Sequence, residues 1–579
     1  MVRILDALSA PRPLPLLLAG ALLTAIAYCL LLFSFSFLAG TSPVWSNARG
    51  IVTNSWADMP TALSGYFYFI RDGWRLPLFH VAGLGGVDGT NIIFTDSIPL
   101  LALLGRALYR VAGLTVNPYG AWTAFCFIAS ALSMTWLVAL LGQRSIASAL
   151  IATVVGLCMP ALLFRWGHLP LMAQFEIVLA LVFAVASKRH CRPLPHFIAS
   201  ALLCLLALWT NAYLFVMVSG IVGATIGQAL LDRAVCPRTG LGLIATLTAV
   251  ILGAILLSGY FSGKNSPSDI GFGLFSMNLL SPLAVQASGV FVWRKGILDA
   301  TGGQYEGFAY LGLGILLLLF AAIPEIAAQA VSAWKRYPIL VTVLAVFTAF
   351  ALSNQIFVGD WRMPIIPLPE GVLKLAGVFR SSGRFIWPVL YGTSAMTIVA
   401  TARRGGRGAV PLLLAASVLQ WFDTAPLRAA IAASAAAPAP LPLNADAWRP
   451  AIARHNIVRV LPSFGCLPIR PTWDREVAME IQFLSALAGV PTNTVYTGRH
   501  QGDCVAEQDI EPRIDAREMR IYLHGSEGFR RVRDEAPGQA HCSINPDMAL
   551  CSEVLDDASL SVLLSARRAR EEGEQLRLE

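Results

Sequence analysis

The sequence predicts an α-helical polytopic membrane protein with about eleven transmembrane helices and a C-terminal α+β domain outside the cytoplasm. Three observations support this. Of the 579 residues, 56% are hydrophobic and 13% are charged, which is about half the charged share of a typical soluble protein. Apolar runs long enough to cross a bilayer recur along the chain. Basic residues form short clusters between these runs, which is the positive-inside signal of membrane proteins and argues against nucleic-acid binding.

Eleven apolar segments qualify as predicted spans. The stretch 196–230 is too long for a single crossing, so we divide it where the polar residues at 210–213 interrupt it. Residues 14–38 exceed the apolar core of a signal peptide, and we expect them to remain as the first helix. The predicted spans are 14–38, 119–141, 146–164, 169–187, the two halves of 196–230, 241–259, 308–330, 338–354, 386–402 and 409–422.

The basic clusters decide the predicted topology. With the N-terminus in the cytoplasm, eleven spans place every cluster on the cytoplasmic side, as in a bacterial inner-membrane protein. These clusters lie at Arg3 and Arg12, Arg144, 188–192, 233–238, Lys335 and Arg336, and 403–407.

The apolar segment 98–114 is not counted as a span. It is short, is interrupted by Arg106 and Arg110, and would place the basic loops on the wrong face if it crossed. We expect it to be an interfacial helix within a long first outer loop, 39–118. The predicted domains are therefore 1–430, which holds the membrane helices and this loop, and 431–579 outside the cytoplasm.

The C-terminal region contains four of the ten cysteines, Cys466, Cys504, Cys542 and Cys551. An even number in a polar domain indicates disulfides and an oxidising compartment, and all three pairings stay open. No glycine-rich phosphate loop of the Walker type is present, so we do not expect ATP-driven transport by this chain.

Two carboxylates in the first outer loop are candidate catalytic groups. Asp58 and Asp96 are both flanked by apolar and aromatic residues, a setting that can raise the pKa of a carboxyl group or prepare it as a general base. Two alternatives stay open. Asp58 could cap a helix that begins at Met59, and Asp96 could cap the helix at 98–114.

The other candidates bind substrate. Arg165 and His168, in a short turn between two spans, could hold a phosphate; alternatively, Arg165 reaches lipid headgroups and His168 caps a helix. Arg380 and Arg384 flank two serines before a predicted span and form a candidate anion clamp, because cations are not favoured by the dipole at a helix N-terminus. Glu306 lies where a span begins, where it could bind substrate or complement the helix dipole.

These features resemble the GT-C class of integral membrane glycosyltransferases. The shared features are Asp58 after the first span, a long first outer loop with a membrane-parallel helix, and an external C-terminal domain. The phrases TDSIP (95–99), QYEGFAYLG (304–312) and FRSSGRF (379–385) resemble signatures of an uncharacterised bacterial multi-pass family placed near that class. The resemblance covers about residues 10–430.

The resemblance implies transfer of a sugar from a polyprenyl-phosphate-linked donor to an extracytoplasmic glycan or lipid. Asp58 would be the base and Asp96 a second carboxylate for the acceptor or a divalent cation. Arg165, Arg380 and Arg384 would then contact lipid phosphate. The paired acids of the GT-C class are absent, since Met59 follows Asp58. The alternative is a non-catalytic transporter or assembly component for envelope polysaccharide.

Overall fold

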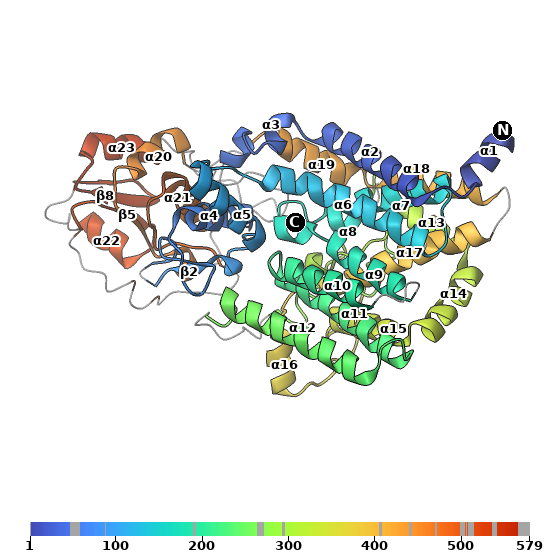
Figure 1. The fold of residues 1–579 in the computed structure, drawn as a ribbon. Coiled ribbons are helices and arrows are strands. Elements are labelled where there is room, and N and C mark those ends of the chain that lie inside the picture. Colours follow the sequence, from blue (N-terminus) through green and yellow to red (C-terminus); the bar gives the residue numbers. More distant parts are fainter. Residues whose placement is uncertain are drawn as a thin grey trace. The chain divides into compact units, whose positions relative to one another are not determined.

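The structure is a computed structural model that divides into two compact units (Figure 1). Unit 1 comprises residues 1–38, 119–254 and 266–433, and unit 2 comprises 39–118, 255–265 and 434–579. The residues that the structure describes are 2–46, 58–86, 88–188, 193–262, 271–291, 296–404, 408–438, 443–468, 472–497, 504, 507, 514–534 and 541–565. Residues 189–192 and 405–407, parts of two predicted basic clusters, lie outside these ranges.

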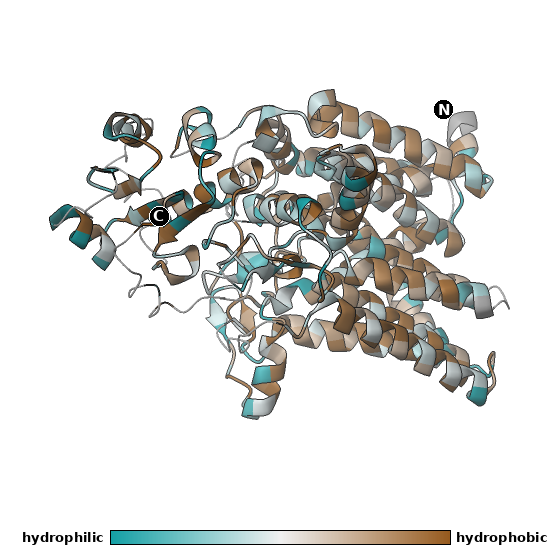
Figure 2. Ribbon diagram, turned by 60° about the vertical axis from the view of Figure 1, so that its left-hand side comes forward, coloured by the Kyte–Doolittle hydropathy of each residue, from teal (hydrophilic) through white to brown (hydrophobic). Residues whose placement is uncertain are grey.

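Unit 1 is a bundle of apolar helices, which Figure 2 colours mostly brown along their length. Its first half comprises α1 (Val2–Ser9), α2 (Leu14–Leu32), α3 (Phe35–Leu38), α6 (Tyr119–Leu140), α7 (Ile146–Cys158), α8 (Pro160–Leu163), η3 (Leu169–Met172), α9 (Phe175–Ser187), α10 (Pro193–Leu208), α11 (Ala212–Leu231) and α12 (Pro237–Ser258). Its second half comprises η4 (Gln304–Gly307), α13 (Leu313–Ala321), α14 (Ile323–Arg336), α15 (Pro338–Leu352), β3 (Phe357–Val358), β4 (Trp361–Arg362), α16 (Glu370–Gly377), η5 (Ser382–Ile386), α17 (Trp387–Arg403), α18 (Ala409–Asp423) and α19 (Ala425–Ala436). The last turns of α12 and α19 belong to unit 2.

Local sequence sets several boundaries in this bundle. Ser145 is the N-cap residue of α7, and its hydroxyl accepts a hydrogen bond from Ser148 N at 3.1 Å. The Asn211 side chain accepts from Tyr213 N at 2.9 Å and begins α11. Each cap satisfies an amide that has no partner within its helix. The polar interruption at 210–213 is therefore the start of a new helix.

The chain is a helical membrane protein. Within its described part, seven helices are long and apolar enough to cross a membrane, and nine if each of two bent pairs is one span. The apolar helices Pro195–Leu208 and Pro338–Leu352 are shorter. Helices thus occupy every segment predicted as a span, but by length and composition alone they establish fewer than eleven crossings.

One predicted span differs from the structure. Residues 308–330 do not form a single helix, because Phe308–Leu311 are non-helical and α13 and α14 meet at 87°. Gly312 has φ +87°, and a Cβ there would lie 2.2 Å from Gln420 Nε2. Pro324 lies in the first turn of α14, where its ring and missing N–H are tolerated, whereas they would disrupt a continuous helix. The predicted span 409–422 likewise continues past a 47° bend into α19.

Unit 2 contains a mixed four-stranded sheet formed by the C-terminal region. Its strands are β5 (Ile457–Leu461), β6 (Glu518–Leu523), β7 (His541–Ile544) and β8 (Met548–Ser552). Their order is β5-β6-β8-β7, with β5 parallel to β6 and the other pairs antiparallel. The accompanying elements are α20 (Ala445–Ile452), η6 (Phe464–Cys466), α21 (Thr472–Ala488), α22 (Glu527–Asp534) and α23 (Asp557–Ser565).

Alternation along the strands gives this sheet two apolar faces. Val458, Val460 and Ile521 belong to the larger core, which includes residues of α20, α21 and α23. Tyr522 and Cys551 belong to a smaller core with residues of α22. Successive residues of a strand point to opposite faces, so the same strands contribute to both cores.

Residues 39–118, the predicted first outer loop, belong to unit 2 as well. They contain η1 (Pro43–Ser46), α4 (Asp58–Arg71), β1 (His80–Val81), β2 (Thr90–Asn91), η2 (Ile92–Phe94) and α5 (Pro99–Ala112). The helix α4 packs on the C-terminal region: the Tyr68 hydroxyl donates to Val490 O, and Gln482 Nε2 donates to Thr61 Oγ1 at 3.1 Å. Thr492 N donates to Gly83 O at 2.9 Å. The loop and the C-terminal region are therefore packed against each other.

Two disulfides join the C-terminal cysteines. The structure pairs Cys466 with Cys504 and Cys542 with Cys551. The second pair follows from strand register, because Cys542 on β7 is directly opposite Cys551 on β8.

Candidate functional site

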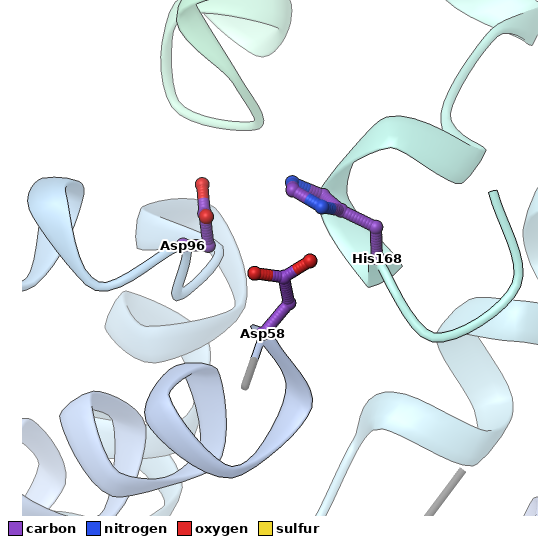
Figure 3. A group of neighbouring side chains, drawn as sticks. All are labelled: Asp58, Asp96 and His168. Carbon is purple, nitrogen blue, oxygen red and sulfur yellow. The ribbon is translucent and has the colours of Figure 1, made fainter. Parts of the chain in front are cut away.

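The two candidate catalytic carboxylates lie together in unit 2. Asp58 is the first residue of α4, and Asp96 lies in the turn before α5. Oxygen atoms of the two carboxylates lie within 4.8 Å of each other. Figure 3 shows the two side chains beside each other. The predicted pair, 38 positions apart in the sequence, is therefore one local group in space.

The TDSIP phrase holds Asp96 against α4. Thr95 Oγ1 and Ser97 Oγ lie 2.9 Å apart, and the Ser97 hydroxyl donates to Ala62 O at 2.7 Å. Gly65 on α4 makes room for both hydroxyls, because a Cβ there would lie 2.3 Å from each oxygen. Asp96, between them, has φ +53°, a left-handed conformation that Asp adopts more readily than most residues.

The structure decides the alternative role of Asp96 as a helix cap. The N-cap residue of α5 is Ile98, whose side chain makes no cap hydrogen bond. Asp96 is therefore not the N-cap residue of α5. Asp58 does lie in the first turn of α4, where the helix dipole stabilises a carboxylate, so a structural contribution accompanies any chemical one.

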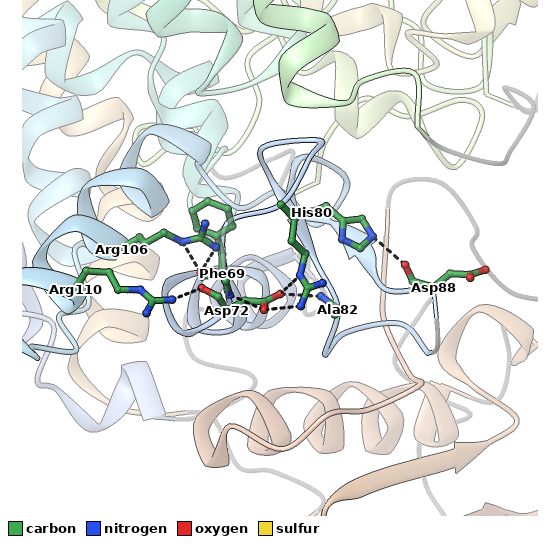
Figure 4. Close-up of polar contacts among 9 residues, drawn as sticks. Phe69, Asp72, His80, Ala82, Asp88, Arg106 and Arg110 are labelled. Atoms are coloured by element: carbon green, nitrogen blue, oxygen red, sulfur yellow. Dashed lines mark hydrogen bonds and ion pairs between the residues drawn. The ribbon is translucent and has the colours of Figure 1, made fainter.

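Two arginines stabilise the opposite end of α4. Arg106 is fully buried, donates to Phe69 O at 2.9 Å and lies 3.5 Å from the centre of the Phe69 ring (Figure 4). Arg110 donates to Asp72 O at 2.8 Å. Cations are favoured near the C-terminus of a helix, whose last carbonyls have no partner within it. Burial lowers the pKa of Arg106 to about 10, so it is charged at neutral pH. The arginines that interrupt the apolar segment 98–114 thus anchor the helix that carries Asp58.

In unit 1, Glu306 lies between two of the predicted substrate-binding arginines. Arg165 Nη1 donates to Glu306 Oε2 at 2.6 Å, and its Nη2 donates to the carbonyls of Tyr305 at 3.1 Å and Glu306 at 3.0 Å. Arg384 Nε and Nη2 each lie 2.9 Å from the same carboxylate oxygen. The side chains of Arg165 and Arg384 are 5% and 7% exposed, so both charges lie inside the protein. We call Arg165, Glu306 and Arg384 the Glu306 cluster.

Two glycines bring the halves of the Glu306 cluster together. A Cβ on Gly383 would lie 2.5 Å from Gly307 Cα, and a Cβ on Gly307 would lie 2.5 Å from Ser276 O. Gly383 N also donates to Phe275 O at 3.0 Å. The QYEG and SSGR phrases therefore meet backbone to backbone, an approach that a side chain at Gly383 would prevent.

The surrounding charges keep Glu306 ionised. Burial raises the pKa of Glu306, but the positive charges of Arg165, Arg384 and His168 outweigh it, and the pKa falls to about 2. One carboxylate therefore balances two guanidinium groups, with the buried His168 close enough to affect it. The Glu306 cluster carries a net positive charge.

The predicted clamp of Arg380 and Arg384 is divided in the structure. Arg384 is buried, whereas Arg380 is exposed, with its guanidinium 5.8 Å from the ring centre of Phe275. Tyr213 is a contributor that the sequence did not reveal. Its ring centre lies 4.6 Å from the Arg384 guanidinium, and its hydroxyl accepts from Ser381 N at 3.1 Å. The only signal was the polar interruption at 210–213.

Comparison with known proteins places the chain in a family. The family described as "Domain of unknown function (DUF6311)" matches residues 21–425. This chain belongs to the DUF6311 family. The match includes both carboxylates and the whole Glu306 cluster, so every candidate residue other than the cysteines lies within the DUF6311 region.

No curated protein matches this DUF6311 chain. A solved structure that resembles it is the archaeal oligosaccharyltransferase AglB from Archaeoglobus fulgidus, in complex with an inhibitory peptide and a dolichol-phosphate. The identity is 12% and the TM-score is 0.36. The likeness covers 83% of this chain but only 64% of the length of AglB.

Proposed function

We propose that this DUF6311 member is a membrane glycosyltransferase that transfers a sugar from a polyprenyl-phosphate-linked donor to an extracytoplasmic glycan or lipid. The observation that carries the proposal is the pairing of Asp58 and Asp96 within 4.8 Å. Two carboxylates at that spacing can have different roles in group transfer: one accepts a proton, and the other orients a substrate or binds a cation. The position of Asp58 after the first predicted span and the long first loop, which resemble the GT-C class, support the same assignment.

In the proposed reaction, Asp58 accepts the proton of an acceptor hydroxyl. The acceptor oxygen forms a bond to the anomeric carbon of the sugar as the bond from that carbon to the donor phosphate oxygen breaks. The electron pair of the broken bond leaves with the polyprenyl phosphate. Because the leaving group is already a phosphate, the protein needs to deprotonate the acceptor, orient it and stabilise the departing charge.

The carboxylate pair also suits a divalent cation. Mg²⁺ is commonly bound through one or two carboxylates, with waters and substrate phosphates as the other ligands. Asp58 and Asp96 would supply the carboxylate oxygens in such a site. When bound, the cation would supply positive charge for the phosphate of the donor.

The Glu306 cluster is the proposed phosphate-binding group. Its two guanidinium groups exceed the charge of its one carboxylate, so it retains attraction for an anion. Arg165 and Arg384 are the residues that contact the phosphate in this proposal, as the sequence predicted. Glu306 is a positioning residue, since its carboxylate holds both arginines in place.

The proposed topology has eleven crossings in a bacterial inner membrane, with the N-terminus in the cytoplasm. The C-terminal domain then lies in the periplasm, where the pairs Cys466–Cys504 and Cys542–Cys551 can oxidise. Reporter fusions at residue 579 and in the loop around Lys335 should report opposite sides of the membrane. The same side for both would refute this topology.

The first prediction tests the base. The change Asp58→Asn should lower transfer by about 10²- to 10⁴-fold, the usual contribution of a general base, while the protein still accumulates in the membrane. The readout is mass spectrometry of envelope glycans and of lipid-linked sugars in a strain whose chromosomal copy is deleted. Asp88→Asn is the matched control, because Asp88 is an exposed carboxylate of the same loop.

Loss of the glycan together with accumulation of a lipid-linked donor is the expected result for Asp58→Asn. Unchanged glycan composition would remove Asp58 as the base. If Asp88→Asn also abolished the glycan, the loss in Asp58→Asn would reflect damage to the loop and would not identify Asp58 as the base.

A transport role is the second candidate, and one observation favours it. The non-helical segment Phe308–Leu311 is buried and is followed by a sharply bent helix pair, and interrupted helices recur in transporters. In that case, lipid-linked sugar would cross the bilayer without a change in covalent structure. Asp58→Asn would then leave every glycosidic linkage intact.

A further inference from the structure

The helix α14 exposes its apolar side, which is the reverse of a helix on a soluble protein. Ile323, Val331 and Trp334 are each more than half exposed, and no described residue of α14 is buried. A surface helix of a soluble protein turns its apolar stripe toward the core. The uncovered stripe of α14 therefore requires another apolar environment.

The sequence of α14 follows the helical period on both sides. Apolar residues recur at the spacing i, i+3, i+4, i+7, i+8 and i+11, namely Ile323, Ile326, Ala327, Ala330, Val331 and Trp334. Polar residues recur on the opposite side at i, i+4, i+7 and i+11, namely Glu325, Gln329, Ser332 and Arg336. A helix with one continuous polar stripe is unsuited to full immersion in hydrocarbon, but it suits an interface between water and lipid.

The geometry of the bend also favours the interface. The axis of α14 makes an angle of 87° with that of the apolar helix α13. With 14 residues, α14 is about 21 Å long at 1.5 Å per residue, shorter than the roughly 30 Å of hydrocarbon in a bilayer. If α13 follows the membrane normal, α14 runs in the membrane plane.

Basic residues lie at both ends of α14. Lys335 and Arg336 close the helix. Lys188 Nζ, from the end of α9, donates to Arg336 O. Arg404, after the end of α17, pairs with Glu325 at 3.4 Å. The one acidic side chain of α14 is therefore neutralised, and the terminal charges of the helix are positive.

We propose that α14 lies in the membrane plane and binds a lipid surface, with its apolar stripe among the acyl chains and Lys335 and Arg336 on anionic headgroups. The combination of an apolar stripe with cationic residues is the recognition chemistry of an interfacial helix. The leaflet is the one facing the basic loops, a choice that rests on the topology proposed above. This interaction is independent of glycosyl transfer and assigns a boundary of the membrane on unit 1.

The immersion of α14 can be measured by spin labelling of the full chain in nanodiscs of phosphatidylcholine and phosphatidylglycerol. Nitroxides are placed at Ala330→Cys on the apolar stripe and at Ser332→Cys on the polar stripe as the matched control. Cys191 and the exposed Cys236 are replaced by Ser in both. We expect the label at 330 to be accessible to oxygen and protected from a water-soluble nickel reagent, and the label at 332 to show the reverse.

Equal exposure of both labels to the nickel reagent would overturn the proposal. Equal access of both labels to oxygen, with protection from nickel, would make α14 a crossing segment and overturn it as well. Dipolar broadening at 330, lost on dilution with unlabelled protein, would place a second copy on the stripe and not lipid.

The anionic preference is tested separately by native mass spectrometry of protein extracted from equimolar phosphatidylglycerol and phosphatidylcholine. We expect the wild type to retain more phosphatidylglycerol, and the double change Lys335→Gln with Arg336→Gln to reduce that excess at least twofold. Lys374→Gln is the control, because Lys374 is an exposed lysine paired with Glu370 on α16. An unchanged excess in the double variant would refute the assignment of Lys335 and Arg336.

Discussion

Each unit of the molecule contains a glutamate held by two arginines, but the two clusters are built differently. In unit 1, Glu306 holds Arg165 and Arg384, which are 141 and 78 positions away in the sequence. In unit 2, Glu518 pairs with Arg520 on its own strand at 2.8 Å and with Arg459 on the neighbouring strand at 3.2 Å. We call Arg459, Glu518 and Arg520 the Glu518 cluster. The Glu306 cluster joins three distant segments, whereas the Glu518 cluster follows from the register of two paired strands.

Solvent access separates the two clusters further. Both arginines of the Glu306 cluster are buried. In the Glu518 cluster, Glu518 and Arg520 are also buried, but the Arg459 side chain is 29% exposed, so water screens its pairing. A buried charge that loses its partner costs far more than an exposed one. Substitutions in the Glu306 cluster should therefore lower the free energy of unfolding more than substitutions in the Glu518 cluster.

The largest effect is expected for Glu306→Gln. Removing the carboxylate leaves two buried guanidinium groups without their counter-charge, and we expect a loss of roughly 3 kcal/mol in the free energy of unfolding. Thermal unfolding of the purified protein in detergent measures it. Glu518→Gln is the matched change in unit 2 and should cost less, since Arg459 reaches solvent. An equal or larger loss for Glu518→Gln would contradict the comparison.

The pH dependence of stability should show the same difference. The pKa of Glu306 is about 2 in the folded protein against 4.5 for an ordinary glutamate. Because the folded pKa is the lower one, its stabilisation is complete above about pH 4.5 and is lost as the pH falls toward 2. The shift corresponds to roughly 3 kcal/mol. The difference in unfolding free energy between wild type and Glu306→Gln should fall to about half between pH 7 and pH 3. A constant difference over this range would exclude Glu306 as the source of the pH dependence.

A smaller effect is expected for Gly383→Ala. The added Cβ would meet the backbone of Gly307, so η4 and η5 must separate and the ion pair between Glu306 and Arg384 must lengthen. Overpacking of this kind typically costs about 1–3 kcal/mol. Gly392→Ala in α17 is the control, because a Cβ there meets nothing within 4 Å. Comparable unfolding temperatures for both variants would show that the close contact at Gly383 does not determine the stability of the protein.

The smallest effect is expected for Arg459→Gln. This arginine is partly exposed, and Arg520 still holds Glu518 with two hydrogen bonds of 2.8 and 3.0 Å. We expect a loss of less than about 1 kcal/mol, the usual value for an exposed ion pair. Urea unfolding followed by a probe in unit 2 is the measurement. A loss above 2 kcal/mol would mean that Arg459 is essential to the Glu518 cluster.

Much of the secondary structure could be predicted because it depends on short stretches of sequence. Apolar runs identify helices, and the polar residues at 210–213 identify the start of α11, where Asn211 makes the cap. The interruption by Arg106 and Arg110 sets the segment 98–114 apart from the predicted spans, and α5, with 14 residues, is not among the helices long enough to cross. The prediction failed at 308–330, because a hydropathy average does not register Gly312 and Pro324, which set the conformation there.

The candidate site was less predictable, since it depends on contacts between distant residues. Apolar surroundings identify Asp58 and Asp96 as separate candidates, whereas their proximity results from the hydroxyls of Thr95 and Ser97 packing at Gly65. The sequence identifies Arg165 and Arg384 as cations for a phosphate, but it does not indicate that Glu306 holds both.

By itself, the sequence determined that this is a helical membrane protein with a C-terminal region of a different kind, because composition and periodicity are local properties that burial in lipid or protein must match. It also supplied the residues capable of chemistry. Only the tertiary structure decided which of them meet: Asp58 with Asp96, and Arg165 with Glu306 and Arg384. The physical reason is that an ion pair or a carboxylate pair depends on the distance between atoms, which the packing of whole elements sets and which spacing along the chain does not record.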